Sequence, residues 1–512
     1  MRKLLAVLLV GVALATAGVW WVKFEHSAPK VSLGAPLTVL GRTTPFDVDV
    51  HTGTPGLRDA KVRLVANGSG ANGASFDLLT TAYPPGSFAT SAVTDTRLHV
   101  EADLVTLKVP EGAATVEVFV DTYAWHLFAQ PSGPLLTVPV TVHLTPPKIE
   151  LLTTQHNVRL GGADVVVYRQ SADTTRSGVE VDKYFFPAIT NFFSDPSVAL
   201  AFFAVPQDLT PSVRPRLVAS DVVGNRREVA LPCTIKPREF AERTLAIDDD
   251  FLTRKVADLE HENSLPPTAD LVAGYLAINR ELRQRNETQI HDLTARSHPQ
   301  PLWSGVFHRQ SNAAPLSSFA DRRTYTHNGE VIDHQTHLGF DLASLKLSPV
   351  EAAQNGVVVF AGNLGIYGNT VLLDHGMGIF SLYGHLSTIA VQPGVRVTTG
   401  QTLGQTGETG LAGGDHLHFS ILLNGVHVDP VEWWDAHWLH DHVTPKLTMF
   451  PRATTESPAA GAAASNLSGL AAPSDQRERT IEKTPAAGPM ERAPAAGPIE
   501  RTPTAGHEQT HP

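Results

Sequence analysis

The sequence predicts a mainly β, multidomain protein with one helical segment. Three observations support this prediction: apolar residues alternate with polar ones in many short runs, the chain is too long for one hydrophobic core, and its composition shifts sharply near the C-terminus. The 512 residues are 42% hydrophobic and 18% charged, which is typical of a globular protein. The net charge of −11 provides no basic surface, so we expect no nucleic-acid partner.

Residues 1–30 predict a signal-anchor or a signal peptide. Two basic residues precede an uncharged run from Leu4 to Val22. As a helix this run would span about 28 Å, close to the roughly 30 Å hydrocarbon core of a bilayer. An anchor would keep the basic residues in the cytoplasm and place the rest of the chain in the periplasm or outside. Ala15-Thr16-Ala17 also fits a cleavage site, which would release the protein into the periplasm.

Residues 31–145 predict a first β module of the immunoglobulin-like, sandwich type. Phe46, Val48 and Val50 alternate with polar residues, as strands with one buried face do. Short strands separated by turn-rich stretches are typical of such a sandwich. We find no catalytic pattern here and interpret the module as a spacer or a docking module for cell-envelope proteins.

Residues 146–240 predict a second immunoglobulin-like β module with the same role. The apolar run at 165–168 indicates a buried strand. The stretch 217–225 indicates a strand followed by a turn, in which Gly224 and Asn225 would supply the positive φ angles.

Residues 241–300 change to helical periodicity and predict a helical linker. Leu252, Val256 and Leu259 recur at the spacing of one helix face. A pair of prolines separates this helix from a second one, for which Thr268 is the expected N-cap.

Residues 446–512 predict a disordered tail. The segment is rich in Ala, Pro and Gly and contains near-repeats such as PAAGPMERA and PAAGPIERT. Such a composition buries too little apolar surface to offset the entropy of ordering the chain.

Residues 301–445 contain three histidine motifs. The first is His337-Leu338-Gly339-Phe340-Asp341. In one extended strand, His337, Gly339 and Asp341 would point to the same face. Glycine in the middle would then leave room for a metal ion between the imidazole and the carboxylate.

The other two motifs are Asp415-His416-Leu417-His418-Phe419 and Tyr383-Gly384-His385-Leu386. His416 and His418 would share one face of a strand. Two imidazoles and one carboxylate form a typical catalytic zinc set that leaves the fourth position for water. Each motif alone is weak evidence, but all three within one β-rich segment form a far more specific pattern.

Residues 335–432 resemble the lysostaphin/LytM-type zinc metallopeptidases, which are glycylglycine and peptidoglycan endopeptidases. The stretches that carry the resemblance are HLGFDLAS, AAQNGVVVFAGNLGIYGNTVLLDHG, SLYGHLS, VQPGVRVTTGQTLGQTGETG and GGDHLHFSILLNGVHVDPVEW. They follow one another in the family's order. The remainder of the chain is not covered.

The resemblance assigns a role to each of five residues. It implies that His337, Asp341 and His418 bind one Zn²⁺ ion per chain. It also implies that His385 and His416 are catalytic residues that do not bind the metal, but stabilise the transition state and orient the attacking water.

Together, the resemblance and the expected export imply a zinc metalloendopeptidase that hydrolyses stem or cross-link peptides of peptidoglycan. Residues 301–445 are predicted to form its zinc metallopeptidase domain. Two alternatives remain. One is a non-catalytic protein that binds the wall or activates other hydrolases, and the other is a zinc endopeptidase that acts on exported proteins.

Overall fold

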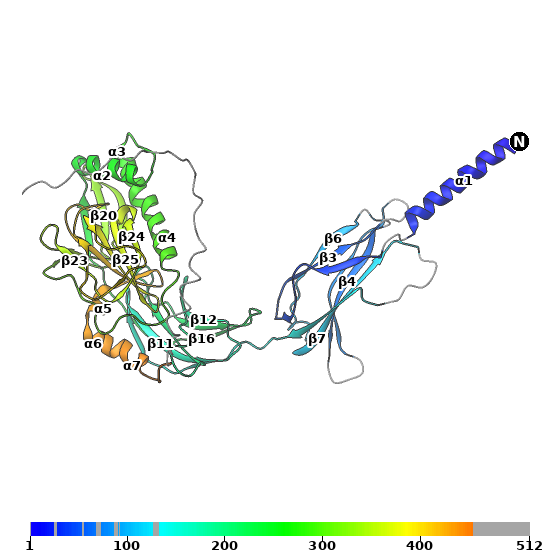
Figure 1. Ribbon diagram of the computed structural model, residues 1–512, viewed down its shortest axis with the longest axis horizontal. Helices are drawn as coiled ribbons and strands as arrows, with labels where there is room; N and C mark the ends of the chain where they lie inside the picture. The colour runs from blue at the N-terminus through cyan, green and yellow to red at the C-terminus, as the bar shows by residue number, and fades with distance from the viewer. Residues whose placement is uncertain are drawn as a thin grey trace, which may run out of the picture. The chain divides into compact units, whose positions relative to one another are not determined.

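The computed structural model describes residues 2–24, 28–53, 56–67, 73–86, 91, 93–125 and 133–453. Over these ranges the chain is mainly β and is built from several parts, which confirms the predicted fold class (Figure 1). The repeats interpreted as a disordered tail lie outside the described residues.

The first element is the helix α1 (Arg2–Lys23), dark blue in Figure 1. Its segment Leu4–Trp21 is long and apolar enough to cross a membrane, and it is not buried against the rest of the chain. A signal sequence near the N-terminus has the same character. The helix therefore agrees with the predicted apolar run and leaves both interpretations of it open.

The first β module consists of two sheets that share one hydrophobic core. In hydrogen-bonded order the strands are β1 (Lys30–Leu33), β3 (Phe46–His51) and β6 (Asp95–Val100) in one sheet, and β2 (Val39–Leu40), β8 (Leu136–Val142), β7 (Gly112–Thr122), β4 (Leu57–Ala66) and β5 (Ser75–Ala82) in the other. Val48 and Val50 on β3 are buried in the same cluster as Val116 and Val118 on β7. Alternate residues of each strand thus face the core, as the sequence pattern predicts.

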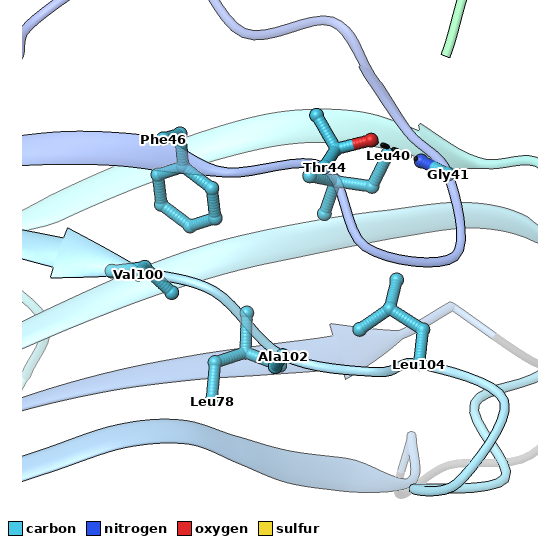
Figure 2. A pocket seen from close by; sticks show the side chains of 8 residues that line it. All are labelled: Leu40, Gly41, Thr44, Phe46, Leu78, Val100, Ala102 and Leu104. Atoms are coloured by element: carbon cyan, nitrogen blue, oxygen red, sulfur yellow. Dashed lines mark hydrogen bonds between the residues drawn. The ribbon is translucent and has the colours of Figure 1, made fainter. Parts of the chain in front are cut away.

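Apolar side chains of this module enclose a cavity of about 10 Å³ (Figure 2). The lining residues are Leu40, Gly41, Thr44, Phe46, Leu78, Val100, Ala102 and Leu104. The backbone N–H of Gly41 donates to Thr44 Oγ1 at 2.7 Å and fixes the chain between β2 and β3. A cavity of this size holds about one water molecule, so these residues form part of the core rather than a ligand site.

The second β module contains three small sheets. In hydrogen-bonded order their strands are β14 (Val198–Ala204), β11 (Ala163–Gln170) and β9 (Ile149–Leu151); β13 (Tyr184–Pro187), β12 (Arg176–Val181), β15 (Arg216–Ser220) and β16 (Arg226–Ala230); and β10 (His156–Arg159) with β17 (Cys233–Lys236). The apolar run at 165–168 lies in β11 and is buried, as predicted. After β15, Gly224 has the expected positive φ of +83°. Asn225 does not have one, because its Nδ2 donates to Asp221 Oδ2 at 2.8 Å and closes the turn in another way.

A large antiparallel sheet follows. In hydrogen-bonded order its strands are β19 (Ala314–Ser317), β22 (Phe340–Ala343), β30 (Leu417–Leu423), β26 (Ile379–Leu386), β25 (Asn369–Gly376), β24 (Gly356–Asn363) and β28 (Arg396–Val397), and β31 (Val426–Val428) also pairs with β30. Two smaller sheets accompany it: β23 (Pro349–Glu351), β29 (Thr402–Gln405) and β27 (Thr388–Ile389); and β18 (Glu242–Ala246), β20 (Arg322–His327) and β21 (Glu330–Thr336). Because β22, β30 and β26 are neighbours, the three histidine motifs come together in the middle of the sheet.

The helical segment packs against this sheet. It contains α2 (Asp249–Glu262), α3 (Leu271–Ala277), the π-helical turn η2 (Ile278–Leu282) and α4 (Arg283–Leu293) (Figure 1). Leu252, Val256 and Leu259 of α2 share one hydrophobic cluster with Leu372 and Leu382 of the sheet. The helix face that the sequence predicts is therefore buried on the sheet.

The start of α3 differs from the expectation. Its N-cap is Asp270 rather than Thr268, because the Asp270 carboxylate accepts the backbone N–H groups of Val272 at 2.9 Å and Ala273 at 3.2 Å. The backbone N–H of Thr268 instead donates to the Glu260 carboxylate at 3.2 Å. Both residue types are good N-caps, and tertiary contacts decide between them.

The second β module and the large sheet share one hydrophobic cluster. Their junction includes the C-terminal elements α5 (Pro430–Trp434), α6 (Ala436–Trp438), η4 (Leu439–Val443) and α7 (Thr444–Leu447). Trp433 is fully buried, with its ring 6.2 Å from that of Phe202 on β14. These contacts hold the second module firmly against the sheet.

The boundary predicted for the tail, residue 446, lies too early. Lys446 Nζ donates to the buried Asp164 carboxylate, and Leu447 is buried in the shared cluster. The backbone N–H of Ala453 donates to Phe192 O at 3.0 Å. The local composition does not reveal these partners, because they lie far away in the sequence.

Glu432 is a buried carboxyl group at the same junction. Its Oε2 accepts the backbone N–H of Ala163 at 2.9 Å. Burial raises the pKa of Glu432 to about 8, although this hydrogen bond opposes the shift. The folded protein therefore holds a proton at pH values where the unfolded chain has lost it.

We expect Glu432→Gln to reduce the pH dependence of stability. A pKa raised in the folded state makes stability fall as pH rises from about 4.5 to about 8, since the unfolded chain then binds fewer protons. The glutamine variant lacks this loss of stability. The Tm of the variant minus the Tm of the native protein should therefore increase as pH rises across this range. Thermal unfolding at a series of pH values measures the difference. A Tm difference that stays constant from pH 5 to pH 8 would contradict the assignment.

Candidate metal centre

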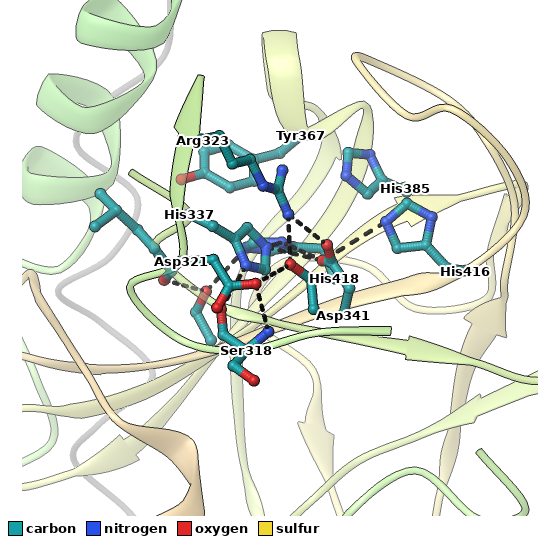
Figure 3. A network of polar contacts seen from close by, with 12 residues as sticks. Ser318, Asp321, Arg323, His337, Asp341, Tyr367, His385, His416 and His418 are labelled. Carbon is teal, nitrogen blue, oxygen red and sulfur yellow. Dashed lines mark hydrogen bonds and ion pairs between the residues drawn. The ribbon is translucent and has the colours of Figure 1, made fainter. Parts of the chain in front are cut away.

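Three side chains from the histidine motifs point their donor atoms at one place. His337 lies just before β22, Asp341 lies in β22, and His418 lies opposite Asp341 in the neighbouring strand β30. His337 Nε2 is 2.9 Å from Asp341 Oδ1 and 3.0 Å from His418 Nδ1, and His418 Nδ1 is 3.0 Å from Asp341 Oδ1. The three residues are 3–5% exposed. Figure 3 shows this cluster.

Hydrogen bonds on the far side of each imidazole select its tautomer. His337 Nδ1 is 2.9 Å from Ser318 O, and a carbonyl oxygen can only accept, so Nδ1 carries the hydrogen. Ser420 Oγ donates to Leu338 O at 3.0 Å, which leaves it to accept from His418 Nε2 at 3.1 Å. Both rings therefore present an unprotonated nitrogen to the cluster. This is the state in which histidine binds a metal ion, so the residues fit a divalent metal such as zinc.

Gly339 is needed for this arrangement, but not in the way that the sequence predicts. Residues 337–339 precede β22, so the expectation that His337, Gly339 and Asp341 share one face of a strand is wrong. A Cβ atom at Gly339 would lie 2.4 Å from His418 Nε2 and 2.6 Å from Ser420 Oγ. The glycine makes room for the imidazole of His418 and its hydroxyl partner rather than for a metal ion.

The second carboxylate oxygen of Asp341 binds an arginine. Arg323 Nη2, on β20, donates to Asp341 Oδ2 at 2.9 Å and to Ser317 Oγ at 2.9 Å (Figure 3). Burial alone would raise the pKa of Asp341, but its contacts with the side chains of His337, His416 and His418 hold it well below its usual range. Asp341 is therefore an anion with Oδ1 directed to the histidines. No sequence pattern indicates Arg323, because it belongs to no motif and lies before the segment that carries the resemblance.

His385 and His416 lie beside this cluster, with ring centroids 4.8 Å apart (Figure 3). His385 Nδ1 is 2.8 Å from Thr409 O, and His416 Nδ1 is 2.8 Å from Gly414 O. Both Nδ1 atoms thus carry hydrogen, and each Nε2 is left for the site. Burial lowers the pKa of His385 well below 6.5, whereas Asp341 raises that of His416 against the effect of burial.

Other titratable groups near the motifs have structural partners. His375 is fully buried between Asn355 O and Ser381 Oγ, and burial lowers its pKa to about 4. His427 Nε2 is 3.1 Å from Glu287 Oε2. Among the described residues, only the group His337, Asp341 and His418 has the geometry of a metal site.

A cleft of about 730 Å³ opens onto the cluster. It is lined by the five motif residues and by residues of β18, β20 and the helical segment. Tyr367, whose ring centroid is 5.2 Å from that of His418, also lines it. The cluster therefore forms part of the wall of a cleft whose volume is in the range of ligand-binding pockets.

Comparison with known proteins points to the same segment. Residues 335–430 match the family described as Peptidase family M23. The chain is 41% identical over 95 residues to the DD-carboxypeptidase/endopeptidase Mpg of Neisseria meningitidis serogroup B, covering 19% of this chain and 22% of that protein. It is 36% identical over 114 residues to the peptidoglycan DD-endopeptidase ShyC of Vibrio cholerae serotype O1, covering 22% and 26% respectively.

A third relative is almost wholly covered. The chain is 37% identical over 94 residues to the lipoprotein NlpD of Yersinia enterocolitica, which is 18% of this chain and 96% of that protein. By contrast, the match spans about a quarter of the length of the Neisseria and Vibrio proteins. The five converging side chains all lie within the matched segment. Through residues 335–430, the chain belongs to peptidase family M23.

Proposed function

We propose that this protein is an exported zinc metalloendopeptidase that hydrolyses peptide bonds in peptidoglycan. The observation that carries the proposal is the convergence of His337, Asp341 and His418, with both imidazoles held in the metal-binding tautomer. Two histidines and one carboxylate form the usual set of a catalytic zinc, whereas a structural zinc would have a fourth protein ligand.

The chain's own residues divide the remaining work. When bound, zinc supplies a Lewis acid that polarises the scissile carbonyl and lowers the pKa of the attacking water. His385 and His416 stand beside it with Nδ1 fixed by backbone carbonyls, so that each Nε2 can orient the water, move a proton or donate to the developing oxyanion. Arg323 keeps Asp341 Oδ2 occupied and leaves Oδ1 for the metal.

The relatives and the helix α1 support the substrate and the location. ShyC is named a peptidoglycan DD-endopeptidase, and Mpg is named a DD-carboxypeptidase/endopeptidase. The apolar segment Leu4–Trp21 would deliver the following chain to the cell envelope, either anchored in the membrane or secreted to the periplasm after cleavage. In that location the proposed substrates are the stem or cross-link peptides of peptidoglycan.

A non-catalytic protein that binds the wall or activates other hydrolases is the second candidate, with the two β modules as its working part. The complete set of ligands and flanking histidines favours catalysis. A zinc endopeptidase that acts on exported proteins would use the same site, and the substrate experiment separates it from a wall hydrolase.

We expect His418→Ala to lose both zinc and activity, because it removes one of three metal donors. The measurements are zinc content per chain and the muropeptides released from intact sacculi. His334→Ala is the matched control, since His334 is exposed on β21 and lies outside the cluster. Chelation of the native protein should abolish release, and added zinc should restore it.

Full activity of His418→Ala on sacculi would disprove the ligand assignment. If the native, zinc-loaded protein released no muropeptides but cleaved exported proteins, the peptidoglycan substrate would be wrong while the zinc site would stand.

We expect His385→Ala and His416→Ala to retain zinc and to lose activity. Neither residue is a proposed ligand, and removing one group that stabilises the transition state typically lowers kcat by about 10²–10³. Zinc content and initial rates on the same preparation measure the two effects separately. If His416→Ala lost as much zinc as His418→Ala, the roles of the two histidines in His-x-His would be wrong.

We expect Gly339→Ala to weaken zinc binding although no proposed ligand is replaced. The new methyl group would meet His418 Nε2 at 2.4 Å, so the imidazole must move away from its position. Zinc affinity, measured by competition with a chromophoric chelator, should fall, whereas Gly329→Ala should leave it unchanged, since that Cβ meets no atom within 4 Å. The positive φ of Gly329 makes a small loss of Tm the expected effect of the control. Equal zinc affinity in Gly339→Ala and the native protein would show that the close approach is unimportant.

A further inference from the structure

Four arginines help to line the cleft to which His337, Asp341 and His418 also contribute. Arg243, Arg254, Arg283 and Arg323 all contribute to this lining. Arg323 pairs with Asp341 at 2.9 Å, and Arg243 pairs with Asp321 at 3.0 Å. Arg283, the first residue of α4, has no ion pair among the described residues, although it is half-buried.

Neutral groups hold the Arg283 side chain in place. Its Nε donates to Asn279 O at 3.1 Å, and its Nη2 donates to Asn279 Oδ1 at 2.7 Å. Asn279 is fully buried, and its Nδ2 donates to Asp333 Oδ2 at 2.8 Å. Asp333 in turn accepts from Arg280 Nε at 2.9 Å. The guanidinium of Arg283 is therefore oriented before any ligand arrives, which lowers the entropy that a ligand must overcome.

Glu287 interacts electrostatically with Arg283, and Asp333 is linked to it through Asn279, but both carboxylates are hydrogen-bonded to other groups. Asp333 is bound by Asn279 and Arg280, as described above. Glu287, one turn further along α4, accepts from Tyr367 Oη at 2.7 Å and lies 3.1 Å from His427 Nε2. Arg283 Nη1 makes no hydrogen bond within the described part of the chain. The cleft thus presents a fixed cation with unused donors.

The helix geometry explains how Arg283 reaches the cleft. The π-helical turn Ile278–Leu282 lies between α3 and α4 and ends immediately before Arg283. A π-helical turn adds one residue to a helix, which shifts the following side chains by about 100° around the axis. Such turns occur frequently at functional sites. Here the turn contains Asn279, the residue that holds Arg283, and joins α3, whose Tyr275 lines the same cleft.

We propose that Arg283 is a specificity-determining residue that binds a free carboxylate of the peptide substrate. The inference rests on the proposed peptidoglycan peptidase function, and it names the feature of the peptide that the cleft selects. Stem peptides of peptidoglycan carry free carboxylates near their cross-links, and a guanidinium is the side chain best suited to bind a carboxylate through two hydrogen bonds. Arg283 lies outside the segment matched by the family, so this selection belongs to the helical segment of this chain.

The test measures how the full exported chain cleaves two substrates. One is a cross-linked stem-peptide dimer with its carboxylates free, and the other is the same dimer with those carboxylates amidated. For Arg283→Gln we expect kcat/KM on the free-carboxylate dimer to fall by about 10- to 100-fold, the loss typical of one hydrogen bond to a charged group, mainly through KM. On the amidated dimer it should stay close to the native value.

Two further variants guard against trivial explanations. Arg285→Gln removes the same charge from an exposed position on α4 that does not line the cleft, and it should leave both substrates unaffected. Arg283→Lys keeps the charge without the fork and should restore part of the preference. Zinc content and Tm of each variant show whether the fold is retained.

Binding of the free-carboxylate and amidated product peptides, measured by calorimetry, separates this inference from the proposed function. Equal losses on both dimers, together with unchanged product binding in Arg283→Gln, would overturn the role of Arg283 and leave the peptidase intact. A native protein that cleaves neither dimer would overturn the proposed peptidoglycan substrate. In that case, weaker binding of the free-carboxylate peptide by Arg283→Gln would still support the role of Arg283, and unchanged binding would overturn it.

Discussion

The buried carboxylate of Asp341 is the constraint on which the site depends. An isolated ionised carboxylate is costly to bury, so each of its oxygens must be satisfied. Oδ1 faces His337 and His418, and Oδ2 accepts from Arg323. These partners come from three different parts of the chain, and the pairing of β22 with β30 brings Asp341 opposite His418. The sheet, the strand β20 and the turn before β22 all serve to surround one anion with the right donors.

The motifs in the sequence include all three side chains whose donor atoms the fold brings together, His337, Asp341 and His418. Their spacing along the chain does not explain the cluster, because it forms only when β22 pairs with β30. The sequence also predicts the β modules, since alternation such as that of Val48 and Val50 follows directly from a half-buried strand.

The remaining features depend on contacts between distant residues. Arg323 on β20 donates to Asp341 on β22, and no sequence pattern around either residue predicts this pair. The apolar face of α2 shows that the helix has a buried side, but not that the large sheet covers it. Lys446 belongs to the fold only because Asp164 lies nearly three hundred residues earlier and is buried beside it. Sequence patterns reveal periodicity among neighbouring residues. Contacts between residues far apart in the sequence leave no such pattern.

The hydrophobic cluster shared by the second β module and the large sheet affects how the protein unfolds and how it responds to proteolysis. Phe202 and Trp433 pack across the junction, so parting the two regions would expose a broad apolar surface on each. Because unfolding either region alone would expose this surface, we expect the two regions to unfold together rather than in succession. We expect a protease cut between them to leave each fragment with an exposed apolar face, which favours self-association.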